Sequence, residues 1–144
     1  MKSIEEAFSS IESLILNDVL PYTETGEAGN YDSLLEARDS DEFATPWADA
    51  YDVVSKLYKE SDINQDIRDR VNIVREHIFK QVYNKTKVSD LASYISDDFE
   101  LILMCLVTKT QNSWVNALWT SYQDKNIPHV SLTEVPGNLV ALVN

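Results

Sequence analysis

The chain has 144 residues with 24 Asp or Glu against 12 Lys or Arg, and its formal net charge at pH 7 is −12. This length fits one domain with a core that needs neither disulfides nor metal, and so negative a charge disfavours direct binding to nucleic acid. The charge is uneven: residues 1–52 hold thirteen acidic and two basic residues, and residues 53–144 hold eleven and ten. We therefore expect a single helical domain over 1–144 that attracts a basic partner.

Glycine, proline and cysteine are scarce. Three glycines and four prolines favour long helices over a turn-rich β fold. The single cysteine, Cys105, lies in the apolar run 101–107, which predicts a buried structural thiol. This longest apolar run is far shorter than the ~20 residues that cross a bilayer, and Glu5 and Glu6 interrupt any signal peptide. We expect a cytoplasmic protein with no membrane segment.

The first helices follow from capping signals and apolar spacing. Ser3 and Glu6 form a capping box, and the helix that it opens should end near Leu20, before Pro21. Residues 21–30 predict a loop, and residues 32–39 predict a short helix. Thr45 as N-cap and Pro46 at the first helical position predict a helix to about Glu60.

The second half of the chain continues the helical pattern. Apolar residues at intervals of three and four predict the longest helix, over 63–84, and its other faces carry mixed charge. Ser89 predicts the start of a short helix, and Ser96 the N-cap of a second helix that begins at Asp97.

The apolar stretch 99–107 places that second helix at the centre of a bundle. A last helix is expected over 113–124, whereas 129–135 could be extended and 139–143 is a short apolar segment of undecided type. The predicted fold is all-α: a compact bundle of about five to seven helices with an irregular C-terminal tail.

The acidic residues cluster in 24–52, where nine carboxylates accompany one cation, Arg38. The cluster is interpreted either as a solubility surface or as a binding face. Tyr31, Trp47 and Tyr51 are interleaved with it and favour binding, because aromatic residues beside charge are typical of interfaces, although they could also belong to the core. As contact residues we single out six acids and one aromatic anchor: Glu36, Asp39, Asp41, Glu42, Asp49, Asp52 and Trp47.

Catalytic motifs are missing from the sequence. It has no glycine-rich phosphate loop, no HExxH, no CxxC and no nucleophile elbow. Asp97, Asp98 and Glu100 could in principle hold Mg²⁺, but acidic residues after a serine N-cap are explained more simply by the helix dipole. We expect no enzyme, no cofactor and no metal, and a small carboxylate-metal enzyme remains the weakest alternative.

Two stretches of the C-terminal half carry a resemblance. Tyr94-Ile95-Ser96-Asp97-Asp98-Phe99-Glu100-Leu101-Ile102, followed by Trp114-Val115-Asn116-Ala117-Leu118-Trp119, resembles small bacterial immunity proteins encoded beside polymorphic toxins of the contact-dependent inhibition type. The resemblance centres on residues 89–124. It implies a cytosolic acidic inhibitor that plugs or covers a basic toxin domain, often a nuclease, and it transfers no residue roles. We expect a monomer that binds one cognate basic toxin domain in a 1:1 complex. A nucleic-acid mimic that binds unrelated basic proteins stays open as an alternative.

Overall fold

The computed structural model describes residues 3–18 and 31–143, and its described part is helical without a strand. The predicted end of the first helix near Leu20 and the predicted loop 21–30 lie outside the described residues. The helices are α1 (Ile4–Asp18), α2 (Asp32–Asp39), α3 (Asp41–Glu60), α4 (Gln65–Thr86), α5 (Ser89–Val107), α6 (Ser113–Gln123) and α7 (Leu139–Leu142). The predicted all-α bundle with an irregular C-terminal tail is confirmed.

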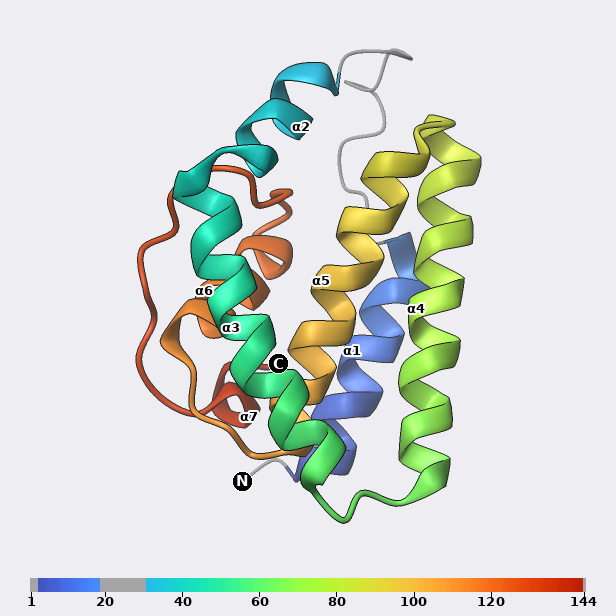
Figure 1. Ribbon diagram of the computed structural model, residues 1–144. Helices are drawn as coiled ribbons and strands as arrows, with labels where there is room; N and C mark the ends of the chain where they lie inside the picture. The colour runs from blue at the N-terminus through green and yellow to red at the C-terminus, as the bar shows by residue number, and fades with distance from the viewer. Residues whose placement is uncertain (1–2, 19–30, 144) are drawn as a thin grey trace.

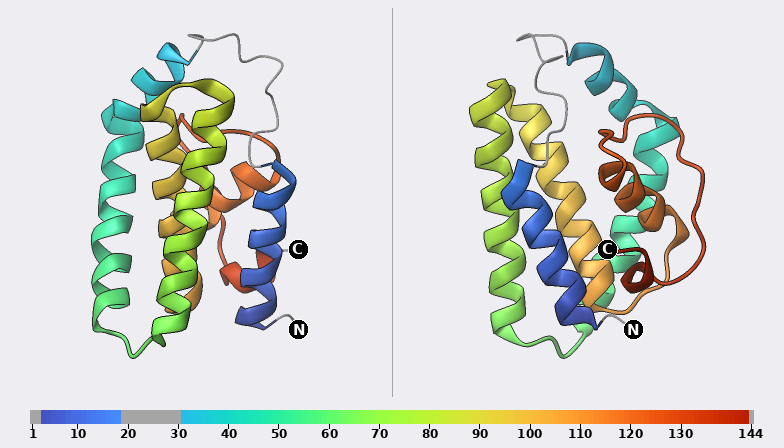
Figure 2. Two further views of the ribbon diagram at one scale, coloured as in Figure 1. Left: turned by 90° about the vertical axis from the view of Figure 1, so that its right-hand side faces the viewer. Right: turned by 180° about the vertical axis from the view of Figure 1, so that it is seen from behind.

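Helix α5 lies at the centre of the bundle (Figure 1). It contacts α1, α3, α4, α6 and α7, and it is buried around most of its circumference. Seen from behind, α1 covers α4 and α5, while α6 and α7 lie beside them (Figure 2). The central position agrees with the apolar stretch 99–107, because a helix that is apolar on every face must be covered on every face.

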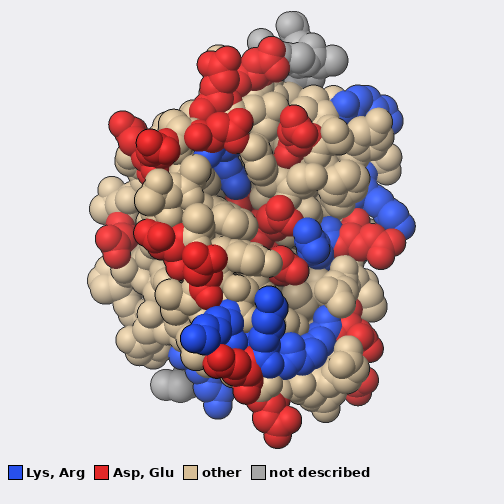
Figure 3. All heavy atoms as spheres, in the orientation of Figure 1, with Lys and Arg blue, Asp and Glu red and all other residues tan. Residues whose placement is uncertain are grey.

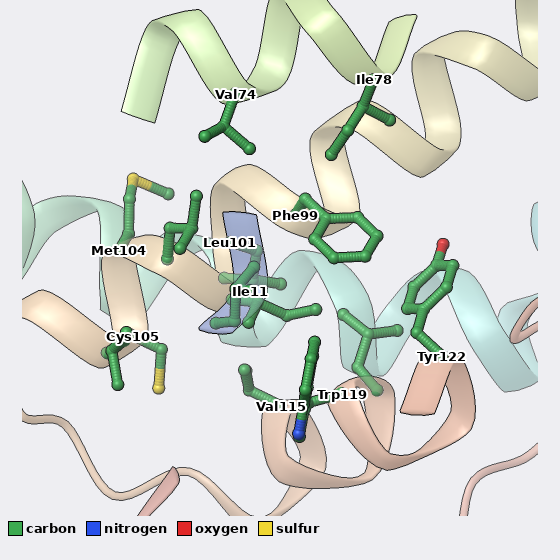
Figure 4. Close-up of a cluster of buried hydrophobic side chains, with 14 of the residues drawn as sticks. Ile11, Val74, Ile78, Phe99, Leu101, Met104, Cys105, Val115, Trp119 and Tyr122 are labelled. Atoms are coloured by element: carbon green, nitrogen blue, oxygen red, sulfur yellow. The ribbon is translucent and has the colours of Figure 1, made fainter. Parts of the chain in front are cut away.

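The core forms where α4, α5 and α6 meet (Figure 4). Phe99 of α5 lies between Ile78 of α4 and the aromatic rings of Trp119 and Tyr122 on α6. Its ring centroid is 4.7 Å from that of Tyr122 and 6.5 Å from that of Trp119. Edge and tilted contacts of this kind stabilise a core beyond the apolar area that they bury.

Capping side chains set several helix starts. The predicted capping box is present: the Ser3 amide donates to Glu6 Oε1 and the Glu6 amide donates to Ser3 Oγ, both at 3.1 Å. Asn64 Oδ1 accepts from the amide of Asp66 at 2.7 Å, so the longest helix begins at Gln65 and ends at Thr86. The range predicted from the sequence, 63–84, therefore starts and ends two residues too early.

Helix α3 begins one turn earlier than predicted. Asp41 and Glu42 form its first turn, and Pro46 lies inside it, so the prediction that Thr45 caps the helix was wrong. The earlier start buries Phe43, which is 1% exposed and packs edge-on against Trp114. This burial offsets the backbone hydrogen bond that Pro46 cannot donate.

Helix α5 is one continuous helix, so the predicted break at Ser96 was wrong. Ser96 is buried, and its hydroxyl donates to the carbonyl of Ser93 at 3.0 Å. A serine bonded in this way to the preceding turn is compatible with a helix interior. Asp97 and Asp98 therefore lie in the middle of α5 and not in its first turn.

The C-terminal segment is irregular up to α7. Residues 129–135 form no strand, and the undecided segment 139–143 contains the short helix α7. Asn116 Nδ2 donates to the carbonyls of Val135 and Gly137 at 2.9 and 2.8 Å, which fastens this segment to α6. Among the described residues, no helix is long and apolar enough to cross a membrane.

Cys105 is fully buried, and its thiol donates to the carbonyl of Thr110 at 3.2 Å. Burial raises the pKa of this thiol to about 12, so almost none of it is thiolate at pH 8. We expect Ellman's reagent to modify the native protein at least about 100-fold more slowly than the protein unfolded in urea. Equal rates in the two states would contradict the buried position of the thiol.

Candidate partner-binding surface

The six acidic residues predicted to contact a partner lie on two consecutive helices. Glu36 and Asp39 belong to α2, and Asp41, Glu42, Asp49 and Asp52 belong to α3. All six are exposed, and we call this group the acidic face. Figure 3 shows acidic side chains over α2 and the adjoining part of α3, while Lys and Arg gather mostly in the lower and right-hand parts of the view.

The carboxylates of the acidic face make few contacts within the chain. Asp39 accepts a hydrogen bond from the Tyr94 hydroxyl, and Glu42 accepts one from Ser131 Oγ at 3.3 Å. The ion pairs among the described residues use other carboxylates, from α1, α4 and α5. The charge of the acidic face therefore remains directed to solvent.

Arg38, the one cation of the acidic segment, is removed from the surface. Its side chain is only 4% exposed and makes a bidentate pair with Asp98, with Nη1–Oδ2 and Nη2–Oδ1 distances of 2.7 Å. Arg38 Nη1 also donates to the carbonyl of Pro128 at 3.0 Å. Since residues 31–52 contain no other Lys or Arg, the exposed side chains of this stretch include no cation.

Asp98 is the centre of a buried polar cluster. Besides Arg38, it accepts from Trp47 Nε1 at 2.8 Å and from the Tyr122 hydroxyl at 2.5 Å. Burial alone would lower the pKa of Arg38, but the facing carboxylate raises it, while burial and the same carboxylate raise the pKa of Tyr122. The guanidinium also lies 4.3 Å from the ring centroid of Phe43. The cluster joins α2, α3, α5 and α6 and so positions the acidic face on the bundle.

No local sequence pattern indicates this cluster, and the prediction that Asp98 serves the helix dipole was wrong. Asp98 does not serve the helix dipole; its carboxylate is fully buried and neutralises Arg38. The two residues are 60 positions apart, and no local pattern relates them. Two sequence features could have suggested the pair: Arg38 is the one cation of an acidic segment, and Asp98 lies directly before the apolar stretch 99–107.

Asp97 and Glu100, the two other candidate metal ligands, both pair with Arg75. Arg75 Nη2 lies 2.6 Å from Asp97 Oδ1, and Arg75 Nη1 lies 3.6 Å from Glu100 Oε2. Burial raises the pKa of Glu100. The carboxylates of Asp97, Asp98 and Glu100 thus pair with two different arginines, and within residues 3–18 and 31–143 no three His, Cys, Asp or Glu gather as a metal ion would need.

Trp47 belongs partly to the core and partly to the surface. Its ring stacks on Tyr51 with centroids 5.1 Å apart and planes at 10°, and its Nε1–H is held by Asp98. Part of the side chain lines a hollow of about 220 Å³ between α2, α3 and α5. Asp39 and Asp97 also line this hollow, which we call the Trp47 hollow.

Comparison with known proteins relates most of the chain to a protein family. A family model described as immunity protein PIM1 matches residues 10–129. This range contains the acidic face, the buried cluster around Asp98 and both stretches that carry the resemblance noted in the sequence. No curated protein matches the chain.

Proposed function

The chain belongs to the immunity protein PIM1 family, and we propose that it neutralises one cognate toxin by covering a basic surface of that toxin with the acidic face. Membership supports an immunity function and, with it, the binding of a cognate toxin. The observation that carries the mechanism is the separation of charge: six carboxylates are exposed on α2 and α3, while the only cation of that stretch is buried against Asp98.

A nuclease is the toxin class that such a surface suits best. An enzyme that cuts DNA or RNA needs a positively charged cleft, because it must attract phosphates. Exposed carboxylates on two helices can occupy that cleft and exclude the nucleic acid. Complementary charge accelerates the encounter, and a standard interface of roughly 800 Å² per partner is within reach of a chain of this size.

We expect the immunity protein to act in the cytoplasm as a monomer that binds one toxin domain. It needs no cofactor, since stoichiometric occlusion requires only complementary surfaces. A nucleic-acid mimic would use the same carboxylates but would bind several unrelated basic proteins, whereas an immunity protein discriminates among toxins.

The test begins with capture of the partner by the tagged protein at low salt, from the bacterium that produces it. We expect one small basic domain, and purified samples of that domain should lose their toxic or nuclease activity at a 1:1 ratio with this protein. A toxin of the same class from another system is the control and should stay active. Capture of several unrelated DNA- or RNA-binding proteins would contradict the proposal and favour the mimic.

A further inference from the structure

We propose that the Trp47 hollow receives one arginine side chain of the toxin, an inference that rests on the proposed function. The hollow lies inside the acidic face, because Asp39 lines it and Ala44 and Trp47 lie on α3 between Glu42 and Asp49. The hollow would add one specific anchor point to a surface that otherwise attracts the toxin through long-range charge.

The aromatic wall of the hollow is held in place before any partner arrives. Trp47 is fixed on one side by its stack on Tyr51 and at its Nε1–H by Asp98. Indole is the best aromatic partner for a cation, and a ring that is already fixed loses little conformational entropy on binding. The other two rings that line the hollow, Phe43 and Tyr94, already face the guanidinium of Arg38.

The charge of the hollow favours a cation. Asp39 on α2 and Asp97 on α5 both line it. The cation among its lining residues, Arg38, is neutralised by its bidentate pair with Asp98. Asp97 also contacts Arg75, whose side chain is 46% exposed, so this pair can rearrange at little cost when a second cation enters.

Arginine suits the hollow better than lysine does. A planar guanidinium can lie on an aromatic ring and at the same time donate to a carboxylate, which the compact ammonium of lysine cannot do equally well. The chain itself contains this arrangement, because Arg38 lies over Phe43 and binds Asp98 at 2.7 Å. In a nuclease, an arginine held here would be withdrawn from the phosphates that it serves.

The decisive variants differ by one helical turn. Ala44→Leu fills the hollow, since Ala44 lines it. Ala48→Leu is the matched control, because Ala48 is exposed on the same helix and does not line the hollow. The two changes add the same apolar volume to α3 and use a residue with high helix propensity, so a difference between them reports on the hollow.

The first measurement uses arginine amide as probe and the indole N–H signal of Trp47 in ¹⁵N-labelled protein, assigned by its loss in Trp47→Phe. We expect a saturable shift in the wild type and in Ala48→Leu, and binding at least about tenfold weaker in Ala44→Leu and for lysine amide. A shift that equals the sodium chloride control, or that is the same in both leucine variants, would overturn the proposal.

The second measurement uses the purified toxin domain. We expect Ala44→Leu to dissociate at least about tenfold faster than Ala48→Leu, because a buried anchor acts mainly on dissociation. If the wild type neutralises the toxin and the two variants dissociate equally, the arginine receptor is wrong while the proposed function stands. If the wild type neutralises no toxin, the proposed function fails, and the arginine amide titration still shows whether the hollow binds a guanidinium.

Discussion

Replacing Arg38 with methionine is expected to lower the free energy of unfolding by about 3–5 kcal/mol. The substitution leaves the fully buried carboxylate of Asp98 without its cation, and only Trp47 and Tyr122 still donate to it. Urea unfolding followed by circular dichroism at neutral pH measures the change directly. An equally large loss is expected for Asp98→Asn, because it leaves the buried guanidinium without a counter-charge.

Two controls separate the buried pair from the general effect of losing a charge. The double variant Arg38→Met with Asp98→Leu removes both charges and should be more stable than Arg38→Met alone, since no ion is left unpaired. Arg75→Met removes the pairs with Asp97 and Glu100, whose arginine is 46% exposed, and should cost no more than about 1 kcal/mol. If Arg38→Met cost no more than Arg75→Met, the buried pair would not hold α2 on the bundle.

Reversing the charge of Asp39, Asp41 and Glu42 to lysine is expected to weaken toxin binding at least about tenfold at low salt, mainly through slower association. The three residues are exposed on adjoining ends of α2 and α3, where a basic partner would meet them first. Surface plasmon resonance at two salt concentrations gives the association and dissociation rates. The loss should shrink as salt screens the charges.

A matched control reverses three exposed acids elsewhere, Glu60, Asp62 and Asp69. It produces the same net charge, so a non-specific charge effect would weaken both triple variants equally. Asp41 and Glu42 also lie in the first turn of α3, where lysine is unfavourable to the helix dipole, so the helicity of both variants must be compared. Unchanged affinity of the Asp39, Asp41 and Glu42 variant at low salt would rule out this part of the acidic face as the contact.

The helices themselves were largely predictable from local pattern. Ser3 and Glu6 specify the start of α1, and the apolar stripe of α4 through Val71, Val74, Ile78 and Val82 is buried as its spacing predicts. Caps and periodicity act within one or two turns, so a single stretch of sequence contains all the information. The start of α3 was predicted wrongly because a distant contact decides it: the burial of Phe43 against Trp114 places the helix start before Pro46.

The acidic face, like the helices, could be predicted from the sequence only in part. Composition alone shows that one third of the chain holds most of the net charge, because counting charges needs no coordinates. The place of each charge needs the fold: Arg38 is withdrawn by a carboxylate 60 residues away, and Trp47 becomes one wall of a hollow with Asp39 and Asp97. Side chains from α2, α3 and α5 meet only after the helices pack, and the energy of a buried charge depends on that meeting. The sequence by itself determined most of the helices and the excess of negative charge in the first third of the chain, because caps, periodicity and composition are local properties. The tertiary structure decided which of those charges stay exposed and which aromatic ring lines the hollow between them.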